Sequence, residues 1–366
     1  MGLKIYSAYL NVCDDYSAQI TNVLKDVEAD TVCGILFCGT STSQYHSLLD
    51  NLRGVVCEVL NKRVPVTLIP QHILPNGGLA VEVYTLDNAT IRFEEREGVC
   101  YGLIEGDEGR MLFVEGIPAT DFTEGVQRQS DEVFGKLDRI LASNDFEVDD
   151  IVRQWNYIGS IVACREGKQN YQEFNDARSR YYGKCEWRNG YPAATGIGSA
   201  EGIIVGGIAF KKAEGGIYPI DNPLQIAAHV YSKSVLIDED KNAVKSTPKF
   251  ERAKLIETER GACCFVSGTA AIRGEASVDA ENAGMQTVCT LENIDYLVSA
   301  ENLVRFGCKP YDLKCVKLHV FIKHADDYEA VRRVVEERYP NVATIYSVAD
   351  VCRSELLVEI EGILIS

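Results

Sequence analysis

The sequence predicts an α+β protein that contains two similar β-rich units, each with helices packed on one face of its sheet. Short apolar strand-like runs alternate with amphipathic helical segments along most of the chain. A Phe-Val-x-Gly motif at 113–116 recurs at 265–268, so that Val266 follows Val114 at an offset of 152 residues. After each copy come a polar loop, a helix and a strand. The length of 366 residues also fits two domains better than one.

Residues 1–60 precede the repeat and form a predicted N-terminal extension. We expect a strand over 3–10, a helix, a buried strand over 31–38 and a second helix that begins near Gln44. The intervening turn, residues 39–43, reads Gly-Thr-Ser-Thr-Ser. Its backbone N–H groups could face a phosphate, but it lacks the lysine of a P-loop, and we interpret it as a helix cap.

The first unit is assigned to residues 61–213 and the second to residues 214–366. Turn signals separate short strands up to residue 104, and a strand over 110–117, a helix over 125–142 and a strand near 148–158 follow. The second unit has a matching segment at 261–272, a helix over 286–298, a strand over 315–322 and a helix over 326–338. The two units end in strands that align when Val358 is placed over Val205, an offset of 153 residues.

The final strand carries the candidate catalytic acid. Glu359 alternates with Val358 and Ile360, the pattern of a strand with one buried face. A carboxyl group buried on such a strand loses hydration, so its pKa rises and it can donate a proton near neutral pH. The alternative is an edge strand whose glutamates face water. The alignment places Glu359 on Gly206, and this asymmetry favours a functional acid, although a glycine at that position could equally mark a bulge.

Charge and composition exclude several classes of function. The chain has 37 basic and 54 acidic residues, a net charge of −17, which argues against a nucleic-acid groove. An anionic ligand would therefore need a local group of arginines. No apolar run is long enough for a membrane helix, and the start of the chain lacks a signal peptide. The 13 cysteines show no CxxC spacing, so we expect a cytoplasmic protein with no metal and no organic cofactor.

Six segments carry a family resemblance, in the same order along the chain. They are Phe174-Asn-Asp-Ala-Arg178, residues 191–198, Phe250-Glu-Arg-Ala253, Ser267-Gly-Thr-Ala-Ala271, residues 286–293 and residues 351–359. Over residues 60–366 the chain resembles a fused tandem of the Rid-like superfamily and, within it, the chorismatases, which hydrolyse chorismate. This resemblance implies two Rid-like, chorismate-mutase-like domains, of which the second carries the catalytic glutamate and the first a degenerate site.

Two departures from related sequences bear on the reaction. Residues 268–275 read Gly-Thr-Ala-Ala-Ile-Arg-Gly-Glu where such sequences commonly read Gly-Thr-Ala-Ser-Ile-Val-Gly-His, which leaves the choice of product open. The arginine that imine deaminases of the superfamily carry before the final glutamate is Thr344 here. Imine deamination is therefore not expected.

The resemblance implies a set of site residues for a small-molecule substrate. Glu359 is the expected general acid for protonation of the enol ether, and arginines are expected to hold the two carboxylates of chorismate. The expected substrate-binding residues are Arg178, Arg165, Arg252, Tyr231, Thr269, Ala271 and Cys352. A cysteine at 352 resembles the branch that forms 3-hydroxybenzoate. The alternatives are a dihydroxycyclohexadiene carboxylate as product, or a non-catalytic protein that binds a small carboxylate. Either a monomer or a homotrimer is consistent with the superfamily.

Overall fold

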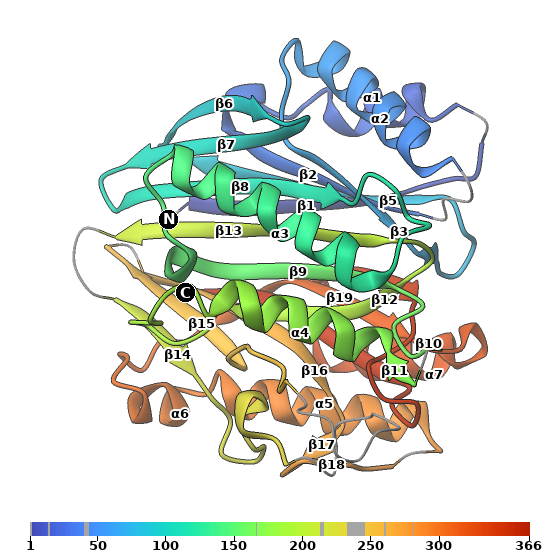
Figure 1. Cartoon of the computed structure of the whole chain (residues 1–366), viewed down its shortest axis with the longest axis vertical. Coiled ribbons are helices and arrows are strands. Elements are labelled where there is room, and N and C mark those ends of the chain that lie inside the picture. The colour runs from blue at the N-terminus through green and yellow to red at the C-terminus, as the bar shows by residue number, and fades with distance from the viewer. Residues whose placement is uncertain are drawn as a thin grey trace.

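Three large β-sheets with helices around them, and two small two-stranded sheets, make up the computed structural model (Figure 1). The structure describes residues 2–13, 15–39, 44–165, 167–212, 216–232, 246–259, 261–279 and 281–366. Residues 40–43 of the turn predicted at 39–43, and the boundary predicted at 213/214, lie outside these residues. Helices α1 and α2 lie at the top of the view, α3 and α4 in front, and α5 and α6 at the bottom. The predicted α+β class is confirmed.

The first sheet has the strand order β1-β5-β2-β3. Its elements are β1 (Gly2–Leu10), α1 (Ser17–Leu24), β2 (Val32–Gly39), α2 (Tyr45–Leu60), β3 (Val66–Pro70) and β5 (Leu79–Asp87). Helix α2 buries Leu49, Leu52 and Val56, whose spacing of three and four residues places them on one face. The segment predicted as an extension thus shares a sheet with residues up to 87.

The second sheet has the order β12-β9-β13-β8-β7-β6. Its strands are β6 (Thr90–Arg96), β7 (Val99–Gly106), β8 (Gly109–Pro118), β9 (Ile151–Gly159), β12 (Ala193–Ser199) and β13 (Ile203–Lys212). Helices α3 (Val126–Ser143) and α4 (Asn170–Tyr182) pack against each other, and the hairpin of β10 (Cys164–Arg165) and β11 (Lys168–Gln169) leads into α4.

The third sheet has the order β14-β15-β16-β21-β19-β20-β4. Its strands are β4 (His72–Ile73), β14 (Ile217–Ile220), β15 (Ala253–Thr258), β16 (Gly261–Ala270), β19 (Lys314–Ile322), β20 (Ala343–Val348) and β21 (Val358–Ile365). The helices of this part are α5 (Ala283–Leu297), α6 (Ala300–Arg305) and α7 (Tyr328–Arg338). A small hairpin, β17 (Ile272–Arg273) and β18 (Ala276–Ser277), follows β16.

The same four-strand pattern occurs in all three sheets. The strand groups are β1-β5-β2-β3, β8-β13-β9-β12 and β16-β21-β19-β20, and in each group two antiparallel pairings are followed by a parallel one. The edge strands of these groups meet in a ring, β16 against β12, β8 against β3 and β1 against β20. The division into an extension over 1–60 and units over 61–213 and 214–366 stays a prediction. The strand pairing favours a division near residue 88.

Strand pairing corrects the predicted alignment of the two final strands. Gly207 pairs with Val114 and Gly362 pairs with Val266, and each pair directly precedes a β-bulge. The true offset is therefore 362 − 207 = 155, so Glu361 takes the place of Gly206 and Glu359 takes the place of Ile204. The predicted offset of 153 was wrong by two residues. Because side chains alternate with a period of two along a strand, a shift by two preserves the buried and exposed pattern and leaves no signal in the sequence.

Candidate active site

Glu359 lies near the start of β21, between β16 and β19, and is 5% exposed. Among the described residues its carboxyl group has no hydrogen-bond partner. Burial, aided by the negative charge of Glu361, raises its pKa to about 8, while Arg252 and Arg153 act in the opposite direction. The group is therefore mostly protonated at neutral pH and can act as a proton donor.

The space for this carboxyl group depends on Gly268. β16 bulges between Val266 and Thr269, and Gly268 lies within the bulge. A Cβ atom at this position would lie 2.0 Å from Oε1 of Glu359. Only glycine therefore leaves room for the acid, and the bulge supplies the local change in strand geometry that brings backbone close to it.

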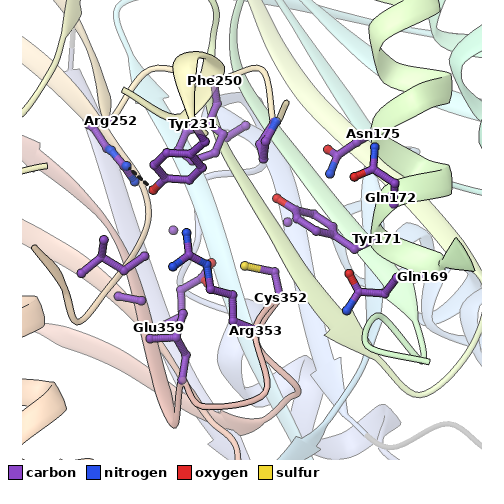
Figure 2. Close-up of a pocket in the computed structure, with 17 residues that line it drawn as sticks. Gln169, Tyr171, Gln172, Asn175, Tyr231, Phe250, Arg252, Cys352, Arg353 and Glu359 are labelled. Atoms are coloured by element: carbon purple, nitrogen blue, oxygen red, sulfur yellow. Dashed lines mark hydrogen bonds between the residues drawn. The ribbon is translucent and has the colours of Figure 1, made fainter. Parts of the chain in front are cut away.

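A pocket lies in front of Glu359, at the junction of the second and third sheets (Figure 2). One wall comes from α4, the residue before it and β12, and consists of Gln169, Tyr171, Gln172, Asn175, Ala194 and Gly196. The other side comes from the third sheet and its loops, with Tyr231, Phe250, Arg252, Cys352, Arg353 and Leu356. The pocket thus needs elements that are far apart in the sequence.

Two arginines face this pocket, and in the part of the chain that the structure describes neither pairs with a carboxylate. Arg252 is 3% exposed and donates hydrogen bonds to the Ile226 carbonyl oxygen at 2.8 Å and to the Tyr231 hydroxyl at 2.6 Å. Arg353 donates to the Glu275 carbonyl oxygen at 2.8 Å, and its guanidinium lies 5.3 Å from the centre of the Tyr231 ring. Across the described ranges neither forms an ion pair with a carboxylate. Buried cations that form no ion pair among the described residues suit an anionic ligand, in a chain of net charge −17.

The pocket contains four of the predicted site residues, Glu359, Arg252, Tyr231 and Cys352. Four others do not line it. Arg178 is 1% exposed, and its guanidinium donates to Asn175 Oδ1 at 2.6 Å. The Thr269 hydroxyl donates to the Ser267 carbonyl oxygen. Ala271 is fully buried and Arg165 is exposed on β10. Substrate contacts by these four residues stay predictions.

The sequence analysis missed several pocket residues that the structure brings together. Arg353 directly follows the predicted Cys352, and Tyr171 and Asn175 stand on the same helix as Arg178. The available signal was that Asn175 and Arg353 stand in two of the resembling segments, whereas Tyr171 lies three residues before the first of them. Arg273, which departs from related sequences, contacts Asn293 and Glu292 on α5 and does not line the pocket.

Cys352 is a neutral thiol in this setting. Burial raises its pKa to about 12, the charge of Glu359 acts in the same direction, and Arg353 only partly opposes them. A thiol of this kind cannot serve as a base or nucleophile at neutral pH. Cys352 therefore contributes shape and polarity to the pocket wall.

Below the site lies a buried network of charges where the three sheets meet. Glu361 accepts hydrogen bonds from Arg153 at 2.6 Å, from Lys317 at 3.0 Å and from Trp155 at 3.1 Å. Burial alone would favour its neutral form, but Lys317 and Arg153 hold its pKa well below the usual range. Lys317 also lies 3.4 Å from Glu82 of the first sheet. The network joins all three sheets.

Within the part of the chain that the structure describes, no group of three or more His, Cys, Asp or Glu side chains could hold a metal ion. No helix in the same residues is long and apolar enough to cross a membrane.

Comparisons with known proteins agree on one family. A family model for "Chorismatase FkbO/Hyg5-like, N-terminal" matches residues 82–209. A 3-hydroxybenzoate synthase of Streptomyces hygroscopicus is 31% identical over 305 residues, which cover 80% of this chain and 83% of that protein. A chorismatase of the same species is 32% identical over 58% of this chain and 60% of its own. A crystal structure of a chorismatase, 22% identical, superposes over 100% of this chain and 99% of its own with a TM-score of 0.73.

Proposed function

This chain belongs to the chorismatase family, and on that premise we propose that it releases pyruvate from chorismate and forms a hydroxybenzoate, chiefly 3-hydroxybenzoate. One observation carries the proposal. A protonated, buried carboxyl group, Glu359, faces a pocket in which Arg252 and Arg353 have no acidic partner among the described residues. Chorismate matches both features, since it has an enol ether that Glu359 can protonate and two carboxylates that the arginines can bind.

Glu359 acts as the general acid. It donates its proton to the methylene carbon of the enol ether, which leaves an oxygen-stabilised cation at the adjacent carbon. Water adds to this carbon, and the resulting hemiketal breaks to pyruvate and a dihydroxylated cyclohexadiene carboxylate. Loss of one water molecule from the ring then gives the aromatic acid. Glu359 is left as a carboxylate and must regain a proton before the next turnover.

The arginines orient the substrate. A guanidinium pairs with a carboxylate through two parallel hydrogen bonds, which fixes the direction of the bound group as well as its charge. Arg252 and Arg353 both lie close to the Tyr231 ring, with their guanidinium groups 5.7 and 5.3 Å from its centre. We therefore assign one substrate carboxylate to this pair and give Tyr231 the role of holding both side chains in place.

Incubation with chorismate and chromatographic separation of the products tests the proposal. Pyruvate together with 3-hydroxybenzoate supports it. Pyruvate together with the diene-diol would mean that the ring is not aromatised, and binding without turnover would identify a carboxylate-binding protein instead. Both of the latter outcomes contradict the proposal.

We further propose a cytoplasmic enzyme that is active as a monomer. A monomer is supported because a single chain closes the ring of three sheets. The same chain supplies all the residues that line the pocket, from the parts of the fold around the second and third sheets. Light scattering on the purified protein, combined with activity across a dilution series, tests this. A trimer whose activity falls on dissociation would overturn it.

A further inference from the structure

Thr195 occupies an unusual position between the buried charge network and the catalytic carboxyl group. Its hydroxyl donates to Glu361 Oε2 at 2.5 Å. It accepts hydrogen bonds from Arg153 Nη2 at 2.7 Å and from the Gly268 amide at 3.1 Å. Thr195 lies on β12 of the second sheet, whereas Glu361 and Gly268 belong to the third. One hydroxyl group therefore ties the two walls of the site together.

Each partner of this hydroxyl group is fixed. Glu361 is 1% exposed and accepts from three further donors, so its carboxylate cannot turn away. Gly268 leaves space for the Glu359 carboxyl group, because a Cβ atom added at Gly268 would lie only 2.0 Å from Glu359 Oε1. A displacement of the Gly268 backbone would therefore displace the acid directly.

We propose that Thr195 and Glu361 are positioning residues for Glu359. Glu361 holds the Thr195 hydroxyl, and Thr195 holds the Gly268 amide, so that the bulge keeps the acid directed at the substrate. The fixed negative charge of Glu361 also opposes ionisation of Glu359, and so promotes return of the proton after each turnover. This inference rests on the proposed function and adds two residues that do not line the pocket.

The charged and titratable groups around Glu359 come from several elements. The positively charged groups that act on Glu359 are Arg153 on β9 and Arg252, which directly precedes β15. The negatively charged group is Glu361, on the same strand as Glu359. The remaining groups that face it in the pocket are Tyr171 of α4, Tyr231, and Cys352 and Arg353 of the loop before β21. Glu361 is thus the group in this set whose charge disfavours a Glu359 carboxylate.

The fold provides a matched control. At the corresponding contact between the second and first sheets, the Thr67 hydroxyl accepts a hydrogen bond from the Gly116 amide at 2.6 Å. Gly116 and Gly268 are the final glycines of the two Phe-Val-x-Gly motifs, 152 residues apart. They lie in equivalent β-bulges. Gly206 stands there in place of Glu361, and Ile204 in place of Glu359. Thr67→Val therefore removes the same backbone contact at a site that lacks a counterpart of the proposed catalytic acid, although the buried Glu115 directly precedes Gly116.

The experiment compares Thr195→Val with Thr67→Val for thermal unfolding and for kcat and KM with chorismate. We expect both variants to lower Tm. Thr195→Val alone should lower kcat by about tenfold or more, with KM within about twofold, because a small displacement of a reacting group has effects of this size. Thr195→Ser, which keeps the hydroxyl, should restore most of the kcat. Wild-type kcat in Thr195→Val, or an equal loss in Thr67→Val, would overturn the proposal.

A second readout does not require turnover. Carbon-13 NMR of the glutamate carboxyl groups, with the Glu359 signal assigned by its loss in Glu359→Gln, gives the pKa of Glu359 directly. Glu361→Gln should lower that pKa by about one or more, since a negative charge is removed and two cations remain; an unchanged value would contradict the role of Glu361. If the wild-type protein does not turn over chorismate, the proposed function fails, whereas this titration still decides the inference. If Glu361→Gln does not fold, the kinetics of the two threonine variants decide it.

Discussion

Replacement of Glu359 by glutamine tests the centre of the mechanism. The amide has nearly the same shape but no proton to donate. A carboxyl group of pKa about 8 is protonated in roughly nine molecules of ten at pH 7, whereas one of ordinary pKa would be protonated in about one of 500. Because general acids contribute about 10² to 10⁴ in rate, we expect Glu359→Gln to lower kcat by about 1,000-fold. KM should stay within about threefold, since Arg252 and Arg353, which we propose bind the substrate, are unchanged.

The same variant should become more stable than the wild type as the pH rises. In the native state the Glu359 pKa is raised, so between the usual value and about 8 the folded protein holds a proton that the unfolded chain releases. Wild-type stability is therefore lost as pH rises through this window, up to about 5 kcal/mol once pH exceeds 8. Glutamine does not titrate and does not lose this stability. The advantage of Glu359→Gln should be small at pH 5 and largest near pH 9.

Pyruvate release measured by a coupled assay gives the first quantity, and urea unfolding at pH 5 and pH 9 gives the second. Glu58→Gln, an exposed position on α2, serves as the control and should match the wild type in both. Substantial turnover by Glu359→Gln would remove its role as the acid. A stability difference that does not change between the two pH values would show that Glu359 does not carry a raised pKa.

Three further predictions concern the residues around the acid. Arg353→Ala should raise KM by about tenfold or more, because a substrate carboxylate loses its partner. The control, Arg180→Ala, breaks a surface pair with Asp131 and should leave KM unchanged. Equal KM values in the two variants would remove Arg353 from the binding site. Gly268→Ala should lower kcat by more than tenfold, because the added methyl group collides with Glu359. Its control is Gly54→Ala, where a Cβ meets no neighbour within 4 Å; wild-type kcat in the Gly268 variant would contradict the steric argument. Cys352 should resist alkylation by iodoacetamide at pH 7 because its pKa is about 12, whereas the exposed Cys164 should react. Mass spectrometry of the labelled peptides distinguishes the two cysteines. Fast labelling of Cys352 would indicate a thiolate and contradict the raised pKa.

The sequence predicted the helices and strands whose apolar residues recur with a clear period. It did not predict the exact helix starts or the third copy of the strand pattern, which do not depend on that period. The helix expected at 125–142 is α3 (Val126–Ser143). The helix expected at 286–298 begins earlier, at Ala283, because the Asn282 side chain accepts a hydrogen bond from the Met285 amide and caps it. The first of the three sheets lacks the Phe-Val-x-Gly motif, so its strand pattern could not be recognised as a further copy.

The candidate acid could be predicted, but its supporting residues could not. Glu359 stands in an alternating apolar strand, which leaves a local signal in the sequence. The choice among arginines depends instead on contacts between distant segments. Arg178 is directed at Asn175 and Arg353 at the pocket, although both stand in segments that carry the family resemblance. Thr195 acquires its role only because β12 meets β16 across the contact between two sheets.

The three sheet contacts explain why the chain has one such acid and not three. The positions equivalent to Glu359 are Ala80 in the first sheet and Ile204 in the second, both buried. An acid at either position would weaken the fold at neutral pH by the same desolvation that raises the pKa of Glu359. An apolar side chain there contributes to the core instead. A buried carboxyl group that lacks a protein partner has a use in catalysis only beside cations that can bind an anionic substrate, and Arg252 and Arg353 lie beside Glu359. The site is therefore confined to the contact at which substrate binding can offset the instability that the acid introduces.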